Sequence, residues 1–275
     1  MENSLKSKFR RHKIATFTTV FCMLMAGWWF SIFIRGLTDS IENEVFTSVY
    51  FVVALWGGIA GLVVSKRWGG YKSILGRAIG AFALGLLGQA FGQIVFNFYL
   101  IVLKVDTPYP SIADIGFFST GLFYGYGAIQ LMKVAGANFS LRNYKGKAIA
   151  IIIPILWAVF SYWFFFRGYQ FDWSQPLATI LDLISPIIDA AYVSLAILAY
   201  LLSRKWLGGF MRWPILFLLV AIISEAVADF HFLYQASRDT WYAAGTNDFL
   251  FLITFTLMAL ALLQLGSSFN KINEG

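Results

Sequence analysis

The chain has few charged residues, a single cysteine and two histidines, and each shortage excludes a class of protein. Charged residues make up only 13% of the 275 residues, whereas 59% are hydrophobic, which is outside the range of soluble domains. The lone cysteine, Cys22, allows no disulfide framework within the chain. The composition therefore predicts neither a soluble domain nor a small secreted domain held by disulfides.

The residues that common cofactor sites require are also scarce. No lysine lies in the middle of an apolar run, which excludes a retinal Schiff base. Only one histidine, His231, lies within an apolar run. A single embedded histidine fits neither bis-histidine haem nor a three-histidine zinc site. No glycine-rich phosphate loop and no Gly-x-Ser-x-Gly elbow occur. We therefore assign no cofactor, metal ligand or catalytic residue, and the sequence argues against an enzyme.

Long apolar runs are abundant, and several exceed the ~18 residues that indicate a transmembrane helix. The predicted fold class is an all-α integral membrane protein with eight transmembrane helices, whose first partner is the lipid bilayer. The first run follows a basic start but has no small-residue cleavage site, so we expect a retained helix. The eight predicted spans lie near residues 14–34, 45–65, 75–103, 112–133, 147–166, 176–202, 213–234 and 247–266.

The basic residues predict the orientation. Of the 21 Lys and Arg, 17 fall on the side that holds both termini and 4 on the other. The positive-inside rule therefore places both termini in the cytoplasm, in a multi-pass protein of the cell membrane. The same distribution places the excess positive charge, which gives the net charge of +7, in the cytoplasmic loops. The orientation therefore explains this charge, and no nucleic-acid partner is expected.

The sequence contains an internal repeat. Ser65-Lys-Arg-Trp-Gly-Gly70 returns as Ser203-Arg-Lys-Trp-Leu-Gly-Gly209, and three further motifs recur at offsets between 132 and 138 residues. Four spans per copy is an even number, so the copies enter the membrane from the same side as two parallel four-helix repeats. The predicted segments are a cytoplasmic start at 1–13, repeats at 14–133 and 147–266, a cytoplasmic linker at 134–146 and a tail at 267–275, with no soluble domain before or after.

The two copies differ where Gln89 and Gln93 of the first become Glu225 and Asp229 of the second. A carboxylate on a lipid-facing surface costs roughly 2.5–3.5 kcal/mol, so embedded acids are candidates for function. Gly88 and Gly92, four apart, predict a close helix-packing face, and we expect the third and seventh spans to pack centrally. Asp182 and Asp189 overlap in depth with the acidic pair. Together these acids predict an outward-facing acidic cavity in the second repeat.

Other interpretations of the same residues stay open. The embedded acids also suit hydrogen-bonded contacts between helices, and His231 suits a packing role. Asp114 follows Ser111 by three residues in a capping-box pattern, and Asp248 opens the eighth span similarly. The candidate ligand-binding residues are Glu225, Asp229, Asp189, Asp182, His231, Gln89, Gln93, Asp114 and Asp248.

Pro108-Tyr-Pro-Ser-Ile-Ala-Asp-Ile-Gly-Phe-Phe118 resembles a segment of the multi-pass membrane sensor regions attached to bacterial diguanylate cyclases and sensor histidine kinases. Pro110, Ser111, Ala113 and Asp114 match the Pro-Ser-x-Ala-Asp stretch of those regions, and Ala228-Asp229 before an aromatic resembles a second recurring piece. The resemblance implies a ligand-sensing membrane module. Those regions feed a cytoplasmic output domain, which we do not expect in this chain, so we expect a signal to pass to a separate cytoplasmic signalling protein.

Three functions compete at this stage. The first is a sensor that binds a small molecule or cation from the outer side. The second is a proton- or cation-coupled transporter in which Glu225 and Asp229 titrate, since duplicated halves and embedded acids are typical of transporters. The third is an intramembrane enzyme, which the shortage of metal ligands other than carboxylates disfavours.

Overall fold

The described part of the chain is almost entirely helical. The structure is a computed structural model, and it describes residues 2–105, 107–134, 144–167, 169–203 and 212–274. No strand occurs among these residues, which confirms the all-α fold class. The elements in order are α1 (Glu2–Ile34), α2 (Ile41–Val49), α3 (Val52–Arg67), η1 (Gly70–Lys72), α4 (Ile74–Asn97), η2 (Phe98–Leu103), α5 (Ile112–Val134), α7 (Tyr144–Ser161), η3 (Tyr162–Phe166), α8 (Pro176–Ser203), α9 (Arg212–Ala236) and α10 (Thr246–Glu274).

Seven stretches within the described residues are long and apolar enough to cross a membrane, as in a helical multi-pass membrane protein. They correspond to all the predicted spans except 112–133. That span forms α5, a helix of 23 residues. Its four glycines, together with Ser119, Thr120 and Gln130, make it less apolar than its neighbours. Length and composition thus support seven of the eight predicted spans. At the eighth, α5 is a helix of similar length.

The helices differ from the predicted spans mainly at their ends. The predicted span 45–65 is two helices, α2 and α3, which meet at Tyr50 and Phe51. The expected segment 1–13 is helical from Glu2, and the expected tail 267–275 is the last part of α10, which ends at Glu274. A helix that has started extends at little cost through residues of good helix propensity. Residues 135–143 of the predicted linker and 204–209 of the repeated basic motif lie outside the described residues.

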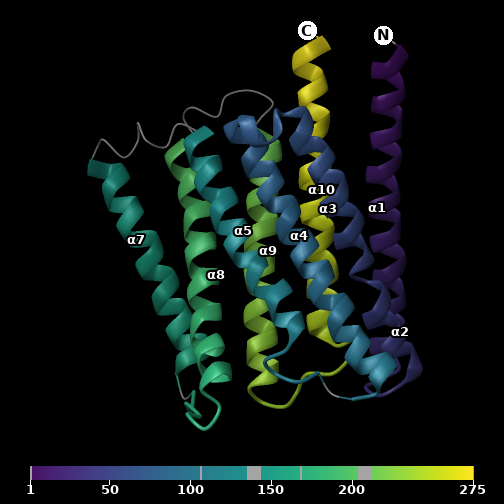
Figure 1. Cartoon of the computed structure of the whole chain (residues 1–275), viewed down its shortest axis with the longest axis vertical. Coiled ribbons are helices and arrows are strands. Elements are labelled where there is room, and N and C mark those ends of the chain that lie inside the picture. The colour runs from purple at the N-terminus through teal and green to yellow at the C-terminus, as the bar shows by residue number, and fades with distance from the viewer. Residues whose placement is uncertain (1, 106, 135–143, 168, 204–211, 275) are drawn as a thin grey trace.

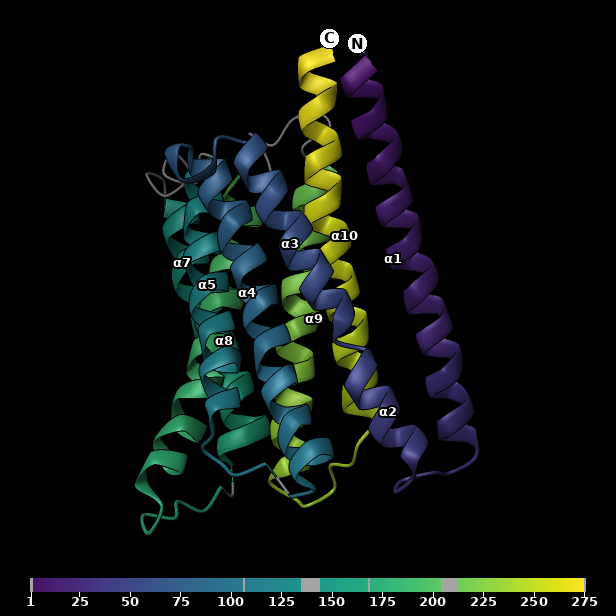
Figure 2. The ribbon, with the colours of Figure 1, turned by 45° about the vertical axis from the view of Figure 1, so that its right-hand side comes forward.

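The helices form one bundle in which neighbours in space are often distant in sequence (Figures 1 and 2). α3 packs on α4 and α4 on α5, and likewise α8 packs on α9 and α9 on α10. The two halves meet where α3 packs on α10 and where α5 packs on α8. α1 and α7 lie at opposite sides of the bundle, and both termini are at the same end (Figure 1). α4 and α9 lie between these flanks, in the central part of the bundle.

Glycines bring α4 and α5 into close contact. A Cβ built on Gly116 of α5 would lie 2.6 Å from the carbonyl oxygen of Gly88 and 2.6 Å from the nitrogen of Gly92. Real Cβ atoms do not approach backbone so closely, so only glycine fits there. The predicted packing face at Gly88 and Gly92 is confirmed, and its partner is the next helix of the same half.

The first half of the chain also holds the loop between α9 and α10. The indole nitrogen of Trp29 in α1 donates to the carbonyl oxygens of Ala244 and Gly245, each at 3.1 Å. The side-chain amide of Asn43 in α2 donates to the carbonyl oxygen of Ala243 at 2.8 Å. These bonds fix the start of α10, which carries part of the candidate site.

Candidate functional site

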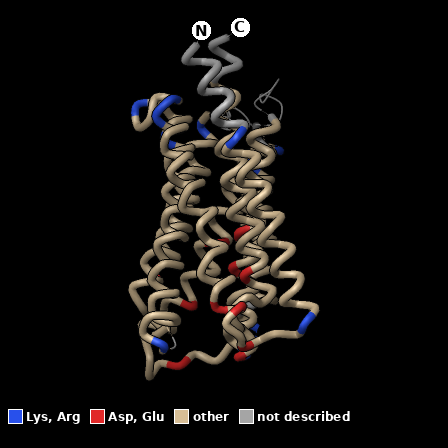
Figure 3. The backbone as a smooth tube through the Cα atoms, turned by 90° about the vertical axis from the view of Figure 1, so that its right-hand side faces the viewer, with Lys and Arg blue, Asp and Glu red and all other residues tan. Residues whose placement is uncertain are grey.

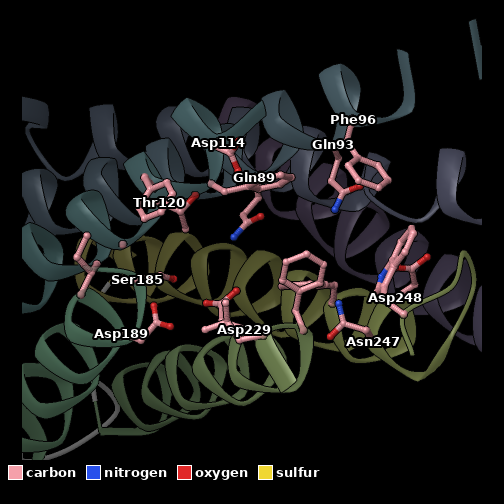
Figure 4. A pocket seen from close by; sticks show the side chains of 18 of the residues that line it. Gln89, Gln93, Phe96, Asp114, Thr120, Ser185, Asp189, Asp229, Asn247 and Asp248 are labelled. Atoms are coloured by element: carbon pink, nitrogen blue, oxygen red, sulfur yellow. The ribbon is translucent and has the colours of Figure 1, made fainter. Parts of the chain in front are cut away.

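A cavity of about 120 Å³ lies between the two halves of the bundle. Its lining comes from α4 and α5 on one side and from α8, α9 and α10 on the other (Figure 4). One buried water needs roughly 10–15 Å³ by a comparable measure, so the cavity has room for several waters or a small organic molecule. Most acidic residues lie in the half of the bundle away from the termini, whereas most basic residues gather at the terminal end (Figure 3).

Six of the nine predicted site residues line this cavity, and three do not. The six lining residues are Gln89, Gln93, Asp114, Asp189, Asp229 and Asp248. Glu225, Asp182 and His231 do not line it. Five elements therefore bring the lining residues together from both halves, although the acidic cavity was predicted for the second half alone.

Asp189 of α8 and Asp229 of α9 both line the cavity. The hydroxyl of Tyr192, one turn after Asp189, donates to Oδ2 of Asp229 at 3.2 Å. Asp189 is only 5% exposed, and its Oδ2 has no hydrogen-bond partner among the described residues. A buried carboxylate oxygen without a partner is costly, so this atom is suited to accept a hydrogen bond from a bound molecule.

Glu225 is not among the residues that line the cavity, which corrects the expectation that it lines the cavity beside Asp229. Its side chain is fully buried. The amide nitrogen of Gln89 donates to its Oε1 at 2.7 Å, and the hydroxyl of Thr254 in α10 lies 3.0 Å from its Oε2. Glu225 and Asp229 share one face of α9 as predicted from their spacing, but Gln89 stands between Glu225 and the cavity.

The two aspartates at helix starts have capping contacts as well as positions on the cavity wall. Oδ2 of Asp114 accepts from the backbone nitrogen of Ser111 at 2.5 Å, which confirms the capping box. Oδ2 of Asp248 accepts from the backbone nitrogen of Ala244 at 2.9 Å and from the hydroxyl of Thr47 at 2.6 Å. Asp248 thereby ties α2 to the start of α10.

Asp182 lies outside the cavity, where two tyrosines hold it. The hydroxyl of Tyr109, in the loop before α5, donates to it at 2.7 Å, and the hydroxyl of Tyr169, in the loop before α8, donates at 2.5 Å. Burial, and after it the hydrogen bond to Asp182, raises the pKa of both tyrosines well above the ordinary value. Because Tyr109 also lines the cavity, this tyrosine clamp lies next to the cavity.

His231 points elsewhere and has a packing partner. Its Nε2 lies 2.8 Å from the hydroxyl of Thr246 at the start of α10. This contact joins α9 to α10 and agrees with the packing role considered for His231 from the sequence. It is one of the three predicted residues that the cavity does not use.

The sequence analysis missed Asn247 and the aromatic walls. Asn247 is 1% exposed, and its Oδ1 has no partner among the described residues. Asn247 could have been found from the sequence repeat, which aligns Ala113-Asp114 with Asn247-Asp248. The first position of this pair changes from an apolar alanine to a polar asparagine. The aromatic walls follow no spacing rule, since they come from four helices and from the loop between α9 and α10. They comprise Phe96, Phe117, Phe118, Phe232, Trp241 and Phe251.

The described residues contain no cluster of three or more His, Cys, Asp or Glu side chains that could hold a metal ion. The lining instead offers spaced oxygen acceptors between aromatic rings. Comparison with protein-family models, with curated proteins and with solved structures finds no match to this chain. The function therefore has to be argued from the site itself.

Proposed function

We propose that the chain crosses the cell membrane eight times, as two parallel four-helix repeats with both termini in the cytoplasm. The packing order supports the repeats, because the contacts of α3, α4 and α5 in the first half recur for α8, α9 and α10. The halves also meet through corresponding helices, α3 with α10 and α8 with α5. The basic residues near the terminal end support the orientation (Figure 3). Reporter fusions at both ends should read cytoplasmic; a periplasmic reading at either end would refute the topology.

On this topology the protein is a membrane-embedded sensor that binds a small molecule from the outer side. The observation that supports it best is a set of buried oxygen acceptors that line the cavity and have no partner among the described residues. They are Gln89 Oε1, Gln93 Oε1, Asp189 Oδ2 and Asn247 Oδ1. Buried polar atoms usually have a hydrogen-bond partner, either in the protein or in ordered water. They suit a bound molecule that donates hydrogen bonds.

Gln89 provides a path from the cavity to the rest of the bundle. Gln89 lines the cavity, and its amide nitrogen donates to Glu225. Glu225 in turn contacts Thr254 of α10, and α10 runs to the end of the molecule that holds both termini (Figure 1). A ligand that moves Gln89 would therefore change the packing of α4, α9 and α10. We propose that the signal then passes to a cytoplasmic signalling protein.

A proton- or cation-coupled transporter is the second candidate. The observation that favours it is the set of three carboxyl groups on α8 and α9, of which Asp189 and Glu225 are buried and Asp229 is half-buried. Reconstituted vesicles discriminate between the two functions. A transporter would carry its substrate, or protons, across the vesicle membrane, whereas a sensor would bind the same compound without flux.

The binding function is tested with purified protein in detergent. A compound library is screened for a rise in melting temperature, and hits are repeated with Asp189→Asn and Asp229→Asn. Both variants should lose the response to a hit. Asp239→Asn is the matched control, because Asp239 is exposed in the outer α9–α10 loop and its positive φ of 53° suits asparagine. If a hit raises the melting temperature of all variants equally, its binding site lies elsewhere.

A further inference from the structure

Three of the four unpartnered acceptors of the cavity residues lie at its two ends, and the fourth, on Gln89, lies between them. Figure 4 places Asp189 and Ser185 at one end, Gln93, Asn247 and Asp248 at the other, and Gln89 and Asp229 between them. The unpartnered oxygens at the ends belong to side chains that are more than nine-tenths buried: Asp189 is 5% exposed, Gln93 7% and Asn247 1%. A ligand that satisfies both ends is elongated and has a hydrogen-bond donor at each end.

The charge of the lining selects a cation. Four aspartates line the cavity, Asp114, Asp189, Asp229 and Asp248, and no Lys, Arg or His is among the described residues that line it. A cleft of one sign between low-dielectric walls attracts ions of the opposite sign and repels ions of its own. An acidic end occurs on both sides of the cavity, with Asp189 at one and Asp248 at the other (Figure 4).

The walls favour an organic cation over a metal ion. Calcium and magnesium need about six or more oxygen ligands around one point, whereas the acceptors here are spread along the cavity. The lining also contains aromatic rings, with Phe117, Tyr192, Phe232 and Phe251 among the lining residues. Such rings pack against methylene groups and attract ammonium groups through their faces.

We propose that the ligand is a short linear diamine, protonated at both nitrogens, which lies along the cavity. One ammonium group donates to Asp189 beside Asp229, and the other donates to Gln93 and Asn247 beside Asp248. The methylene chain lies between the aromatic rings. This inference rests on the proposed binding function and adds the chemical class of the ligand.

The test compares compounds of one length on the unaltered full chain in detergent. Diaminobutane, butylamine, butanediol and succinate are titrated by calorimetry and by melting temperature, with propane and pentane diamines to set the length. The diamine should bind at least about tenfold more tightly than butylamine, because butylamine lacks the second charge-assisted contact. Butanediol and succinate should not bind measurably.

Two variants test which residues bind each end of the diamine. Asp189→Asn should weaken diaminobutane and butylamine alike, since both place an ammonium group there. Asn247→Leu should remove most of the preference for the diamine and leave the affinity for butylamine within about twofold. Asp239→Asn should change neither. The comparison of compounds on the unaltered chain needs no variant, so it decides the question even if a variant fails to fold.

The outcomes separate this inference from the proposed function. Equal binding of butylamine and diaminobutane, or binding of butanediol or succinate, would overturn the diamine but leave a binding cavity. No response to any amine would also overturn it, and the compound screen would then decide the proposed function independently.

Discussion

Gln89 and Glu225 are matched positions of the two sequence copies, 136 residues apart, and they are hydrogen-bonded to each other at 2.7 Å. The pair joins α4 to α9 in the central part of the bundle. Glutamine in one copy and glutamate in the other makes the contact complementary, because an amide donates and a carboxyl group accepts. Two glutamates at this place would repel each other if ionised. The difference between the copies therefore has a structural basis.

This pairing predicts that the shape of Glu225 matters more to stability than its acidity. Glu225→Gln keeps an oxygen that can accept from Gln89 and should change the free energy of unfolding by no more than about 1 kcal/mol. Glu225→Ala leaves a cavity and an unpaired Gln89 amide, and should cost about 2–4 kcal/mol. Tryptophan fluorescence during thermal unfolding in detergent measures both effects. Equal destabilisation by the two variants would show that the charge of Glu225 itself holds the helices together.

The close contact between α4 and α5 gives a second prediction. Gly116→Ala places a methyl group 2.6 Å from backbone atoms of Gly88 and Gly92, so the helices must move apart at a cost of about 1–3 kcal/mol. Gly125→Ala on the same helix is the control. Its methyl group meets nothing closer than Cβ of Tyr192 at 3.8 Å, and alanine is the better helix former by up to about 1 kcal/mol. The melting temperature should fall for the first variant only; equal behaviour would mean that the helices are not in close contact.

The sequence predicts the local features of this molecule well. The capping box of Ser111 and Asp114 depends on residues three apart, and the small-residue face of Gly88 and Gly92 on residues four apart. Both are confirmed, because helix geometry alone relates such neighbours. The same reasoning correctly placed Glu225 and Asp229 on one helix face.

Contacts between distant segments were not predictable in this way. Gln89 separates Glu225 from the cavity, and this depends on how two helices 136 residues apart pack. Asp182 was assigned to the cavity from its depth, yet Tyr109 and Tyr169 from two loops hold it outside. Loop conformation and side-chain direction decide both cases, and neither follows a periodic pattern in the sequence.

The tyrosine clamp predicts a loss of stability in alkaline solution. The pKa of Tyr109 and of Tyr169 is raised in the folded state, whereas an unfolded chain has tyrosine pKa values near about 10. The stability from these hydroxyls is therefore fully present below about pH 10 and is lost as the pH rises through the raised folded-state pKa. In Asp182→Asn the two tyrosines should ionise at lower pH than in the unaltered protein. The absorbance of tyrosinate during a pH titration measures this, with Asp239→Asn as control; identical titration curves would contradict the clamp.

The contact between Thr47 and Asp248 yields the last prediction. Oδ2 of Asp248 accepts from the Thr47 hydroxyl and from the backbone nitrogen of Ala244. Asp248→Asn retains an oxygen for these donors and should cost no more than about 1 kcal/mol, whereas Asp248→Ala leaves both donors without it and should cost about 1–3 kcal/mol. Thr47→Val removes the hydroxyl and should cost about 1 kcal/mol.

A double-mutant cycle with Thr47→Val and Asp248→Ala measures the coupling between these two residues. Once Asp248 is alanine, the Thr47 hydroxyl has lost this acceptor but still accepts from the backbone nitrogen of Ala244 at 2.9 Å, so the two residues are coupled both directly and through Ala244. The two losses, measured as free energies of unfolding in detergent, should therefore not sum to the loss in the double variant. Simple addition would mean that the two residues do not stabilise each other. In that case the start of α10 would be held by Trp29 and Asn43, which contact the same loop.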